Sequence, residues 1–130
     1  MQNRWKKLAN YTVGEIGRRP WGYWRVNAVG MGFVRKTIVV NPGASLSLQS
    51  HRHRSEKWEV VEGIAEVTID STIYLLTPSD SAIEIPIGAI HRLKNIGETI
   101  LTVKETLLGS ILDENDITRY EDLYGRSVYP

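Results

Sequence analysis

The fold is decided by two stretches of the sequence, Gln49-Ser50-His51-Arg52-His53-Arg54-Ser55-Glu56 and Pro86-Ile87-Gly88-Ala89-Ile90-His91-Arg92-Leu93-Lys94-Asn95. Together these stretches contain imidazole, carboxylate and amide side chains, which are ordinary ligands of divalent metals. Every second side chain of a strand shares a face, so Gln49, His51 and His53 are predicted to point the same way. His91 follows a Pro-x-Gly turn and can meet that row across a sheet. The two stretches together predict one metal site.

The sequence around these stretches is a series of short segments rich in Val, Ile, Leu and Thr, separated by turn residues. Turn signals recur roughly every 8–12 residues, which is typical of an all-β sandwich or barrel. Val67 and Ile69 alternate with polar neighbours, as in a half-buried strand. We expect an antiparallel barrel over residues 32–107 with 19–24 as an extra strand. The C-terminal segment 109–126 would include a short helix over 113–124, capped by Asp113.

Length and composition restrict the class of protein. With 130 residues and 42% hydrophobic content, the chain is expected to form a single domain, residues 1–130. The net charge of +1 gives no indication of a nucleic-acid surface. The absence of cysteine rules out thiolate ligands and fits a reducing compartment. No apolar stretch has the length of a signal peptide or membrane span, so we expect a cytoplasmic protein with no membrane partner.

The spacing of the two stretches resembles the two motifs of the cupin superfamily, small jelly-roll-like antiparallel β-barrels with a metal in the barrel mouth. Counting residues against the first motif selects Gly43, Gln49, His51, Glu56 and Gly63, and leaves His53 out. In the second motif Pro86, Gly88, His91 and Asn95 match, while Asp80 stands in place of a glycine. The resemblance implies a metal quartet made of Gln49, His51, Glu56 and His91.

A narrower resemblance rests on three segments, Arg19-Pro20-Trp21-Gly22, the stretch from Ser47 to Trp58, and the stretch from Asp116 to Arg126. They look like the isomerase domain of type II phosphomannose isomerases. That domain is usually the C-terminal part of bifunctional mannose-6-phosphate isomerase and mannose-1-phosphate guanylyltransferase enzymes of bacterial polysaccharide synthesis. No counterpart of the guanylyltransferase half is present in the sequence, so we expect a stand-alone isomerase. Lys57 departs from the family, which usually has histidine there.

The resemblance implies an enzyme that interconverts mannose 6-phosphate and fructose 6-phosphate with one divalent metal ion. We expect zinc, and manganese, cobalt, nickel or iron(II) are also compatible with the ligand types. Removing a proton from carbon needs a base, for which His53 is the first candidate, followed by Lys57 and Glu121. Binding of the phosphate group is assigned to three arginines. They are Arg54, Arg119 and Arg126.

Other interpretations stay open at the level of sequence. The chain can be a non-catalytic metal cupin that binds a sugar or sugar phosphate, or another cupin enzyme such as a dioxygenase. The three histidines can also be ordinary surface or packing residues. The expected partner is a small-molecule sugar phosphate, and the resemblance implies a homodimer.

Overall fold

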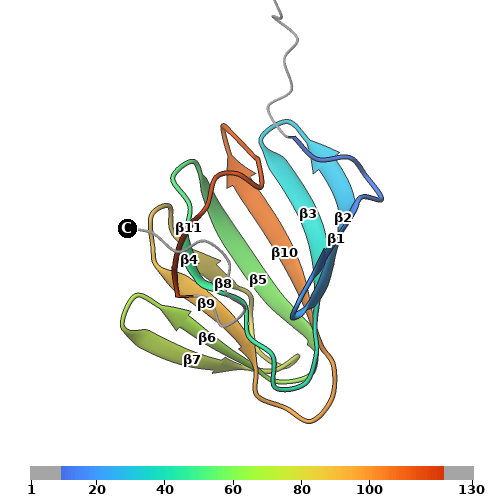
Figure 1. Cartoon of the computed structure of the whole chain (residues 1–130), viewed down its shortest axis with the longest axis vertical. Helices are drawn as coiled ribbons and strands as arrows, with labels where there is room; N and C mark the ends of the chain where they lie inside the picture. The colour runs from blue at the N-terminus through green and yellow to red at the C-terminus, as the bar shows by residue number, and fades with distance from the viewer. Residues whose placement is uncertain (1–9, 122–130) are drawn as a thin grey trace, which may run out of the picture.

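The structure is a computed structural model that describes residues 10–121, which form eleven strands in two antiparallel sheets (Figure 1). The six-stranded sheet has the order β1-β2-β3-β10-β5-β8 and the five-stranded sheet the order β11-β4-β9-β6-β7. The strands are β1 (Ile16–Arg19), β2 (Gly22–Gly30), β3 (Phe33–Val40), β4 (Leu48–Ser50), β5 (Arg54–Glu62), β6 (Ala65–Ile69), β7 (Thr72–Leu76), β8 (Ile83–Ile85), β9 (His91–Asn95), β10 (Leu101–Gly109) and β11 (Thr118–Glu121). The predicted all-β antiparallel architecture is confirmed.

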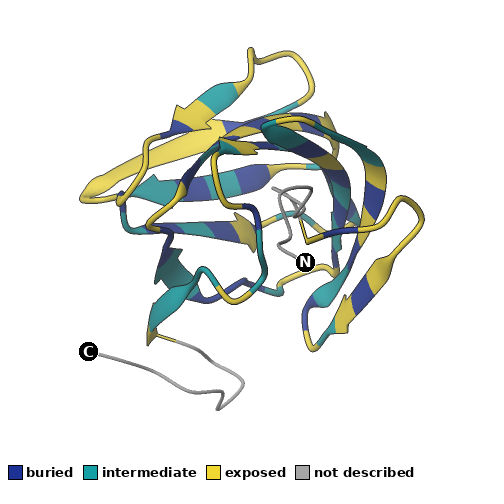
Figure 2. Cartoon of the chain, turned by 90° about the horizontal axis from the view of Figure 1, so that it is seen from above, coloured by how far each residue is buried: buried dark blue, intermediate teal, exposed yellow. Residues whose placement is uncertain are grey.

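The core lies between the two sheets, and buried residues follow their inward faces (Figure 2). In β10 every second residue is buried, so Leu101, Val103 and Leu107 face inward while Lys104 is exposed. Val67 on β6 is fully buried and Ile69 packs against the core, as the alternation predicts. The inward-facing residues of both sheets therefore form one hydrophobic core.

The register of the six-stranded sheet brings charged residues onto this inward face. Glu105 on β10 is paired with Lys36 on β3 and with Trp58 on β5. The next inward residue of β10, Leu107, is paired with Glu56 on β5. Lys36, Glu56 and Glu105 are all buried. Buried charged side chains are rare unless they are paired, so this face is expected to have a polar role in addition to packing.

The predicted helix over 113–124 is wrong for the part that the structure describes, and residues 122–124 lie outside that part. Within 10–121 the structure has no helix. The backbone N–H of Asp116 binds the Asp113 carbonyl at 3.1 Å, which makes a single turn. The chain then pairs with the edge of β4, where Thr118 is opposite Ser50 and Arg119 opposite Gln49. Pairing with an open sheet edge has overridden a weak local helix preference.

The segment 19–24, predicted as one strand, instead contains a hairpin turn and runs from the end of β1 into the beginning of β2. β1 ends at Arg19 and β2 begins at Gly22, and these two residues are paired across the turn. Proline provides no N–H and favours the turn position it occupies here. None of residues 10–121 belongs to a helix with the length and apolar character needed to cross a membrane.

Gly63 provides a test of the turn between β5 and β6. Its φ is +92°, and an added Cβ would lie 2.7 Å from the Ile100 carbonyl oxygen. We expect Gly63→Ala to lower the free energy of unfolding by about 2 kcal/mol or more, measured by urea denaturation. Gly97→Ala is the matched control, because its Cβ would meet nothing closer than 3.5 Å. A Gly63→Ala protein as stable as the wild type would refute this turn geometry.

Candidate metal centre

Three buried side chains with metal-ligand chemistry lie together between the sheets. His51 follows β4, Glu56 belongs to β5 and His91 begins β9. His51 Nε2 lies 3.2 Å from Glu56 Oε2, and His91 Nε2 lies 3.3 Å from Glu56 Oε1. One ligand atom from each residue falls within 4.8 Å of the other two. A single ion can therefore be reached by all three side chains.

Both histidines are held in the tautomer that metal binding requires. His51 Nδ1 lies 2.6 Å from the Asp116 carbonyl oxygen, and His91 Nδ1 lies 2.9 Å from that of Ala89. A carbonyl only accepts hydrogen bonds, so each Nδ1 carries the proton and each neutral ring presents a lone pair on Nε2. His91 Nε2 is buried and, apart from Glu56 Oε1 at 3.3 Å, has no polar partner within residues 10–121. Such an orphaned acceptor fits a cation ligand.

The electrostatics of the three side chains also suit a cation. Burial lowers the pKa of His51 to about 4, although Glu56 opposes the shift. Burial alone would raise the pKa of Glu56, but His51 and Arg54 hold it well below its usual range. For His91, burial is outweighed by contact with Glu56, so its pKa is raised. The buried carboxylate is therefore ionised, and a divalent ion can replace the proton of His91 as its partner.

Gln49, the fourth predicted ligand, is placed beside this group. It is paired with His91 across β4 and β9 and is half-buried. Its amide nitrogen donates to Ser47 Oγ at 3.0 Å and to the Ser47 carbonyl at 3.3 Å. With both N–H groups directed at Ser47, the amide oxygen is left for another partner. Its coordination of a metal stays a prediction.

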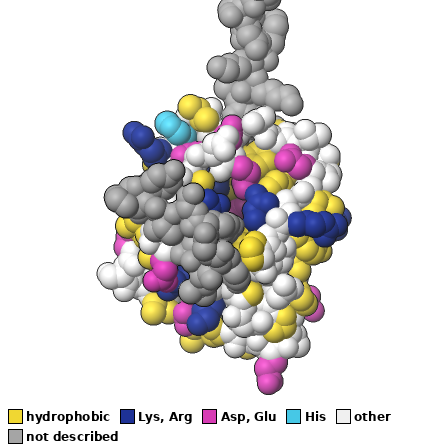
Figure 3. Space-filling view, viewed as in Figure 1, with side chains coloured by type: hydrophobic (Ala, Val, Ile, Leu, Met, Phe, Trp, Pro, Cys, Tyr) yellow, Lys and Arg dark blue, Asp and Glu magenta, His cyan; other side chains and the backbone are white. Residues whose placement is uncertain are grey.

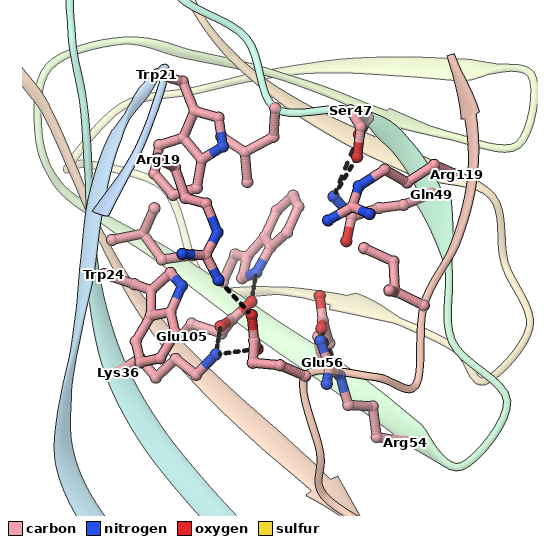
Figure 4. Close-up of a pocket in the computed structure, with 15 residues that line it drawn as sticks. Arg19, Trp21, Trp24, Lys36, Ser47, Gln49, Arg54, Glu56, Glu105 and Arg119 are labelled. Atoms are coloured by element: carbon pink, nitrogen blue, oxygen red, sulfur yellow. Dashed lines mark hydrogen bonds and ion pairs between the residues drawn. The ribbon is translucent and has the colours of Figure 1, made fainter. Parts of the chain in front are cut away.

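Glu56 of this group lines a pocket between the two sheets (Figure 4). Gln49 and Arg119 project into it from one side, and Lys36 and Glu105 from strands of the other sheet. In the space-filling view, acidic and basic side chains lie side by side near the centre of the corresponding face (Figure 3). The lining side chains are those of Arg19, Trp21, Trp24, Lys36, Ile38, Leu46, Ser47, Gln49, Arg54, Glu56, Trp58, Glu105, Glu114, Ile117 and Arg119.

The three predicted phosphate-binding arginines differ in their positions. Arg54 is buried, and its Nε donates to Glu56 Oε2 at 2.9 Å. Its other nitrogens lie 3.2 Å from the Asp113 carbonyl oxygen and 3.3 Å from His51 Nε2. Arg54 therefore supports the ligand group. Arg119 lines the pocket, and Arg126 lies outside the described residues.

The structure does not bring the three candidate bases to the pocket. The predicted alternation from Gln49 to His53 fails because β4 ends at Ser50 and β5 begins only at Arg54. The Asp116 carboxylate accepts the backbone N–H groups of Arg52 and His53, at 2.8 and 2.9 Å, and bends the chain there. The His53 side chain is exposed as a result.

The other two candidate bases are also on the surface. Lys57 alternates with the buried Glu56 and Trp58 and is exposed on the opposite face of β5. Glu121 is exposed and forms an ion pair with Arg92. Either residue could act in catalysis only through a rearrangement that this geometry gives no reason to expect.

Several charged residues of the pocket were missed in the sequence. Lys36 and Glu105 stand at inward positions, Lys36 between Val34 and Ile38 and Glu105 between Val103 and Leu107. A charge in phase with buried aliphatic residues was the available signal. Arg19 is the last residue of β1 and Glu114 lies in the turn before β11, and no periodicity marks either of them.

Comparisons with known proteins show the family of the chain. The family model "Mannose-6-phosphate isomerase C-terminal" matches residues 7–122. The chain belongs to this family. Among its relatives is the alginate biosynthesis protein AlgA of Pseudomonas putida, 51% identical over 112 residues that make up 86% of this chain and 23% of AlgA. The mannose-1-phosphate guanylyltransferase of Escherichia coli is 47% identical over 108 residues, 83% of this chain and 22% of the relative.

The chain thus spans less than a quarter of the length of these curated relatives. Among solved structures, the cupin-2 domain Rru_A2000 of Rhodospirillum rubrum has a TM-score of 0.61 at 17% identity. The match covers 72% of this chain and 67% of that one. This likeness confirms the predicted cupin fold.

Metal binding can be tested with two neighbouring histidines. We expect wild-type protein to bind about one divalent ion per chain, and His51→Ala to lose it, because one of three buried ligands disappears. His53→Ala is the matched control, since that exposed side chain contributes nothing to the group, and it should keep the ion. Elemental analysis and calorimetric titration measure both. Loss of the ion from His53→Ala with retention in His51→Ala would overturn this ligand assignment.

Proposed function

We propose that the chain is a metal-dependent aldose–ketose isomerase that interconverts mannose 6-phosphate and fructose 6-phosphate in the polysaccharide-synthesis context of its relatives. One observation carries the proposal. Glu56, which contacts both His51 and His91, lines a pocket together with four basic side chains, those of Arg19, Lys36, Arg54 and Arg119. A sugar phosphate needs both features, a polarising centre for its carbonyl end and cations for its phosphate.

The metal would be held by Gln49, His51, Glu56 and His91. One carboxylate and three neutral ligands leave a divalent ion with net positive charge, and zinc is our first choice among the compatible ions. When bound, such an ion acts as a Lewis acid beside the sugar oxygens O1 and O2. The chain itself orients the ligands, because Ser47 holds the amide of Gln49 and Arg54 holds Glu56.

The rest of the pocket suits a phosphorylated sugar. Of the predicted phosphate-binding residues, Arg54 and Arg119 line it, and Arg19 and Lys36 add positive charge. The indole N–H of Trp24 is buried and has no hydrogen-bond partner within residues 10–121. It can donate to a sugar oxygen, while the ring itself helps to exclude water. A role for Arg126, the homodimer and the cytoplasmic location stay predictions.

Isomerase activity is tested by a coupled assay with mannose 6-phosphate and metal-loaded protein. We expect turnover that chelators abolish and divalent metal restores, since the ligands alone offer no Lewis acid. Turnover of neither mannose 6-phosphate nor fructose 6-phosphate by metal-loaded protein would contradict the proposal. A cupin that binds the sugar phosphate without converting it would then be the better explanation.

The phosphate contact is tested separately. We expect Arg119→Ala to keep the metal and to weaken sugar phosphate binding by about 10- to 150-fold, because a charge-assisted hydrogen bond is lost. Affinity for the unphosphorylated sugar should change far less. Lys94→Ala is the control, since Lys94 is an exposed residue of β9. Equal effects of Arg119→Ala on phosphorylated and free sugar would remove Arg119 from the phosphate site.

A further inference from the structure

Three side chains joined by a hydrogen bond and an ion pair form a row across the inward face of the six-stranded sheet, on the same face as Glu56. Glu105 is its centre, with Lys36 on one neighbouring strand and Trp58 on the other. Trp58 Nε1 donates to Glu105 Oε2 at 2.8 Å, and Lys36 Nζ lies 3.9 Å from Oε1. The side chains of Lys36 and Glu105 are only 3% and 6% exposed.

This arrangement is costly if it serves only packing. Removing an ammonium and a carboxylate from water is often less favourable than an apolar pair of the same volume. The flanking inward residues of β3 and β10 are aliphatic, so an apolar pair would fit the pattern. Yet Glu105 and Lys36 both line the pocket, with polar atoms directed at it (Figure 4). Their position indicates a chemical role.

The proposed isomerisation also lacks a base, because His53, Lys57 and Glu121 lie on the surface. Two other carboxylates line the pocket, and both are engaged. Glu56 contacts two imidazoles and Arg54. Glu114 accepts from Lys36 at 2.9 Å and from Arg19 at 3.3 Å, and Tyr11 also donates to it. Glu105 has one hydrogen bond and one long ion pair, which leaves acceptor capacity free.

The protonation behaviour of the three carboxyls separates them further. The pKa of Glu114 is lowered to about 2, since burial is outweighed by Lys36 and the Tyr11 hydroxyl. The pKa of Glu56 is also low, as described above. Burial and then the charge of Glu56 raise the pKa of Glu105 to about 7, against the opposing effect of Lys36 and Arg54. Carboxyl groups whose environments separate them in this way commonly divide acid–base and electrostatic roles.

We propose that Glu105 is the catalytic base and acid of the isomerisation, with Lys36 as the residue that positions its carboxylate. The assignment rests on the proposed function. In the aldose-to-ketose direction the Glu105 carboxylate takes the proton from C2, and the electron pair of that C–H bond forms the C1–C2 double bond of an enediolate, whose charge passes to O1. The O2 proton moves to O1, the C2 carbonyl forms, and Glu105 returns its proton to C1. No oxidant or reductant is needed.

The test compares three variants of the metal-loaded protein. Glu105→Gln keeps the shape of the side chain and an oxygen for the Trp58 N–H, but it cannot accept the carbon-bound proton. We expect turnover to fall by about 10²- to 10⁴-fold, the usual contribution of general acid–base catalysis, with metal content and sugar phosphate affinity retained. Glu105→Asp, which keeps the carboxylate, should recover part of the rate. Glu59→Gln is the control, because Glu59 is exposed on the outer face of β5.

A second measurement separates proton transfer from a structural role. In deuterium oxide, exchange of solvent deuterium into the carbon positions of recovered sugar phosphate should be lost in Glu105→Gln together with turnover. Turnover above a tenth of the wild-type rate, or exchange that persists while turnover is lost, would overturn the assignment. If Glu105→Gln does not fold, Glu105→Asp decides, and an unchanged rate in that variant overturns it. Inactive wild-type protein would instead refute the proposed function.

Discussion

The contacts of the Glu56 carboxylate are the constraint on which the rest of the site depends. A fully buried negative charge is tolerated only with close compensation. Here the Arg54 guanidinium donates to it, and the Nε2 atoms of His51 and His91 lie 3.2 and 3.3 Å from its oxygens. These partners come from the end of β4, the beginning of β5 and the beginning of β9. Arg54 lies on the same strand as Glu56, whereas His51 and His91 are carried on or next to strands of the other sheet. The distance between the two sheets is therefore constrained by the contacts of Glu56 with the two imidazoles.

A second level of organisation lies in how charge is distributed across the inward face. Glu56 is surrounded by cationic and donor groups, whereas Glu105 sits where burial and the nearby Glu56 oppose its ionisation. Two chemically identical side chains thus acquire different affinities for protons through their positions on neighbouring strands. Lys36 links this pair to the loop before β11, since it contacts Glu105 and Glu114 at once.

Much of the site was readable from the sequence because it is local. The ligand spacing in the two stretches and the alternation of strands such as β6 depend on neighbours a few residues apart, and His51, Glu56 and His91 do meet. What could not be read depends on remote partners. The bend that exposes His53 is imposed by Asp116, more than sixty residues away. The strand in place of the expected helix exists because β4 offers an open edge. Lys36 and Glu105 were missed, although both alternate in phase with buried aliphatic residues, and only the register shows that they are paired.

The loop before β11 gives the chain a property that neither sheet has alone. Asp116 accepts from His51 through its carbonyl and holds the bend at Arg52 and His53 through its carboxylate. Docking of the segment around Asp116 and cation binding by His51 are therefore thermodynamically coupled. A metal ion held by His51 would therefore stabilise the docked segment around Asp116, and docking of that segment would strengthen metal binding by the same factor.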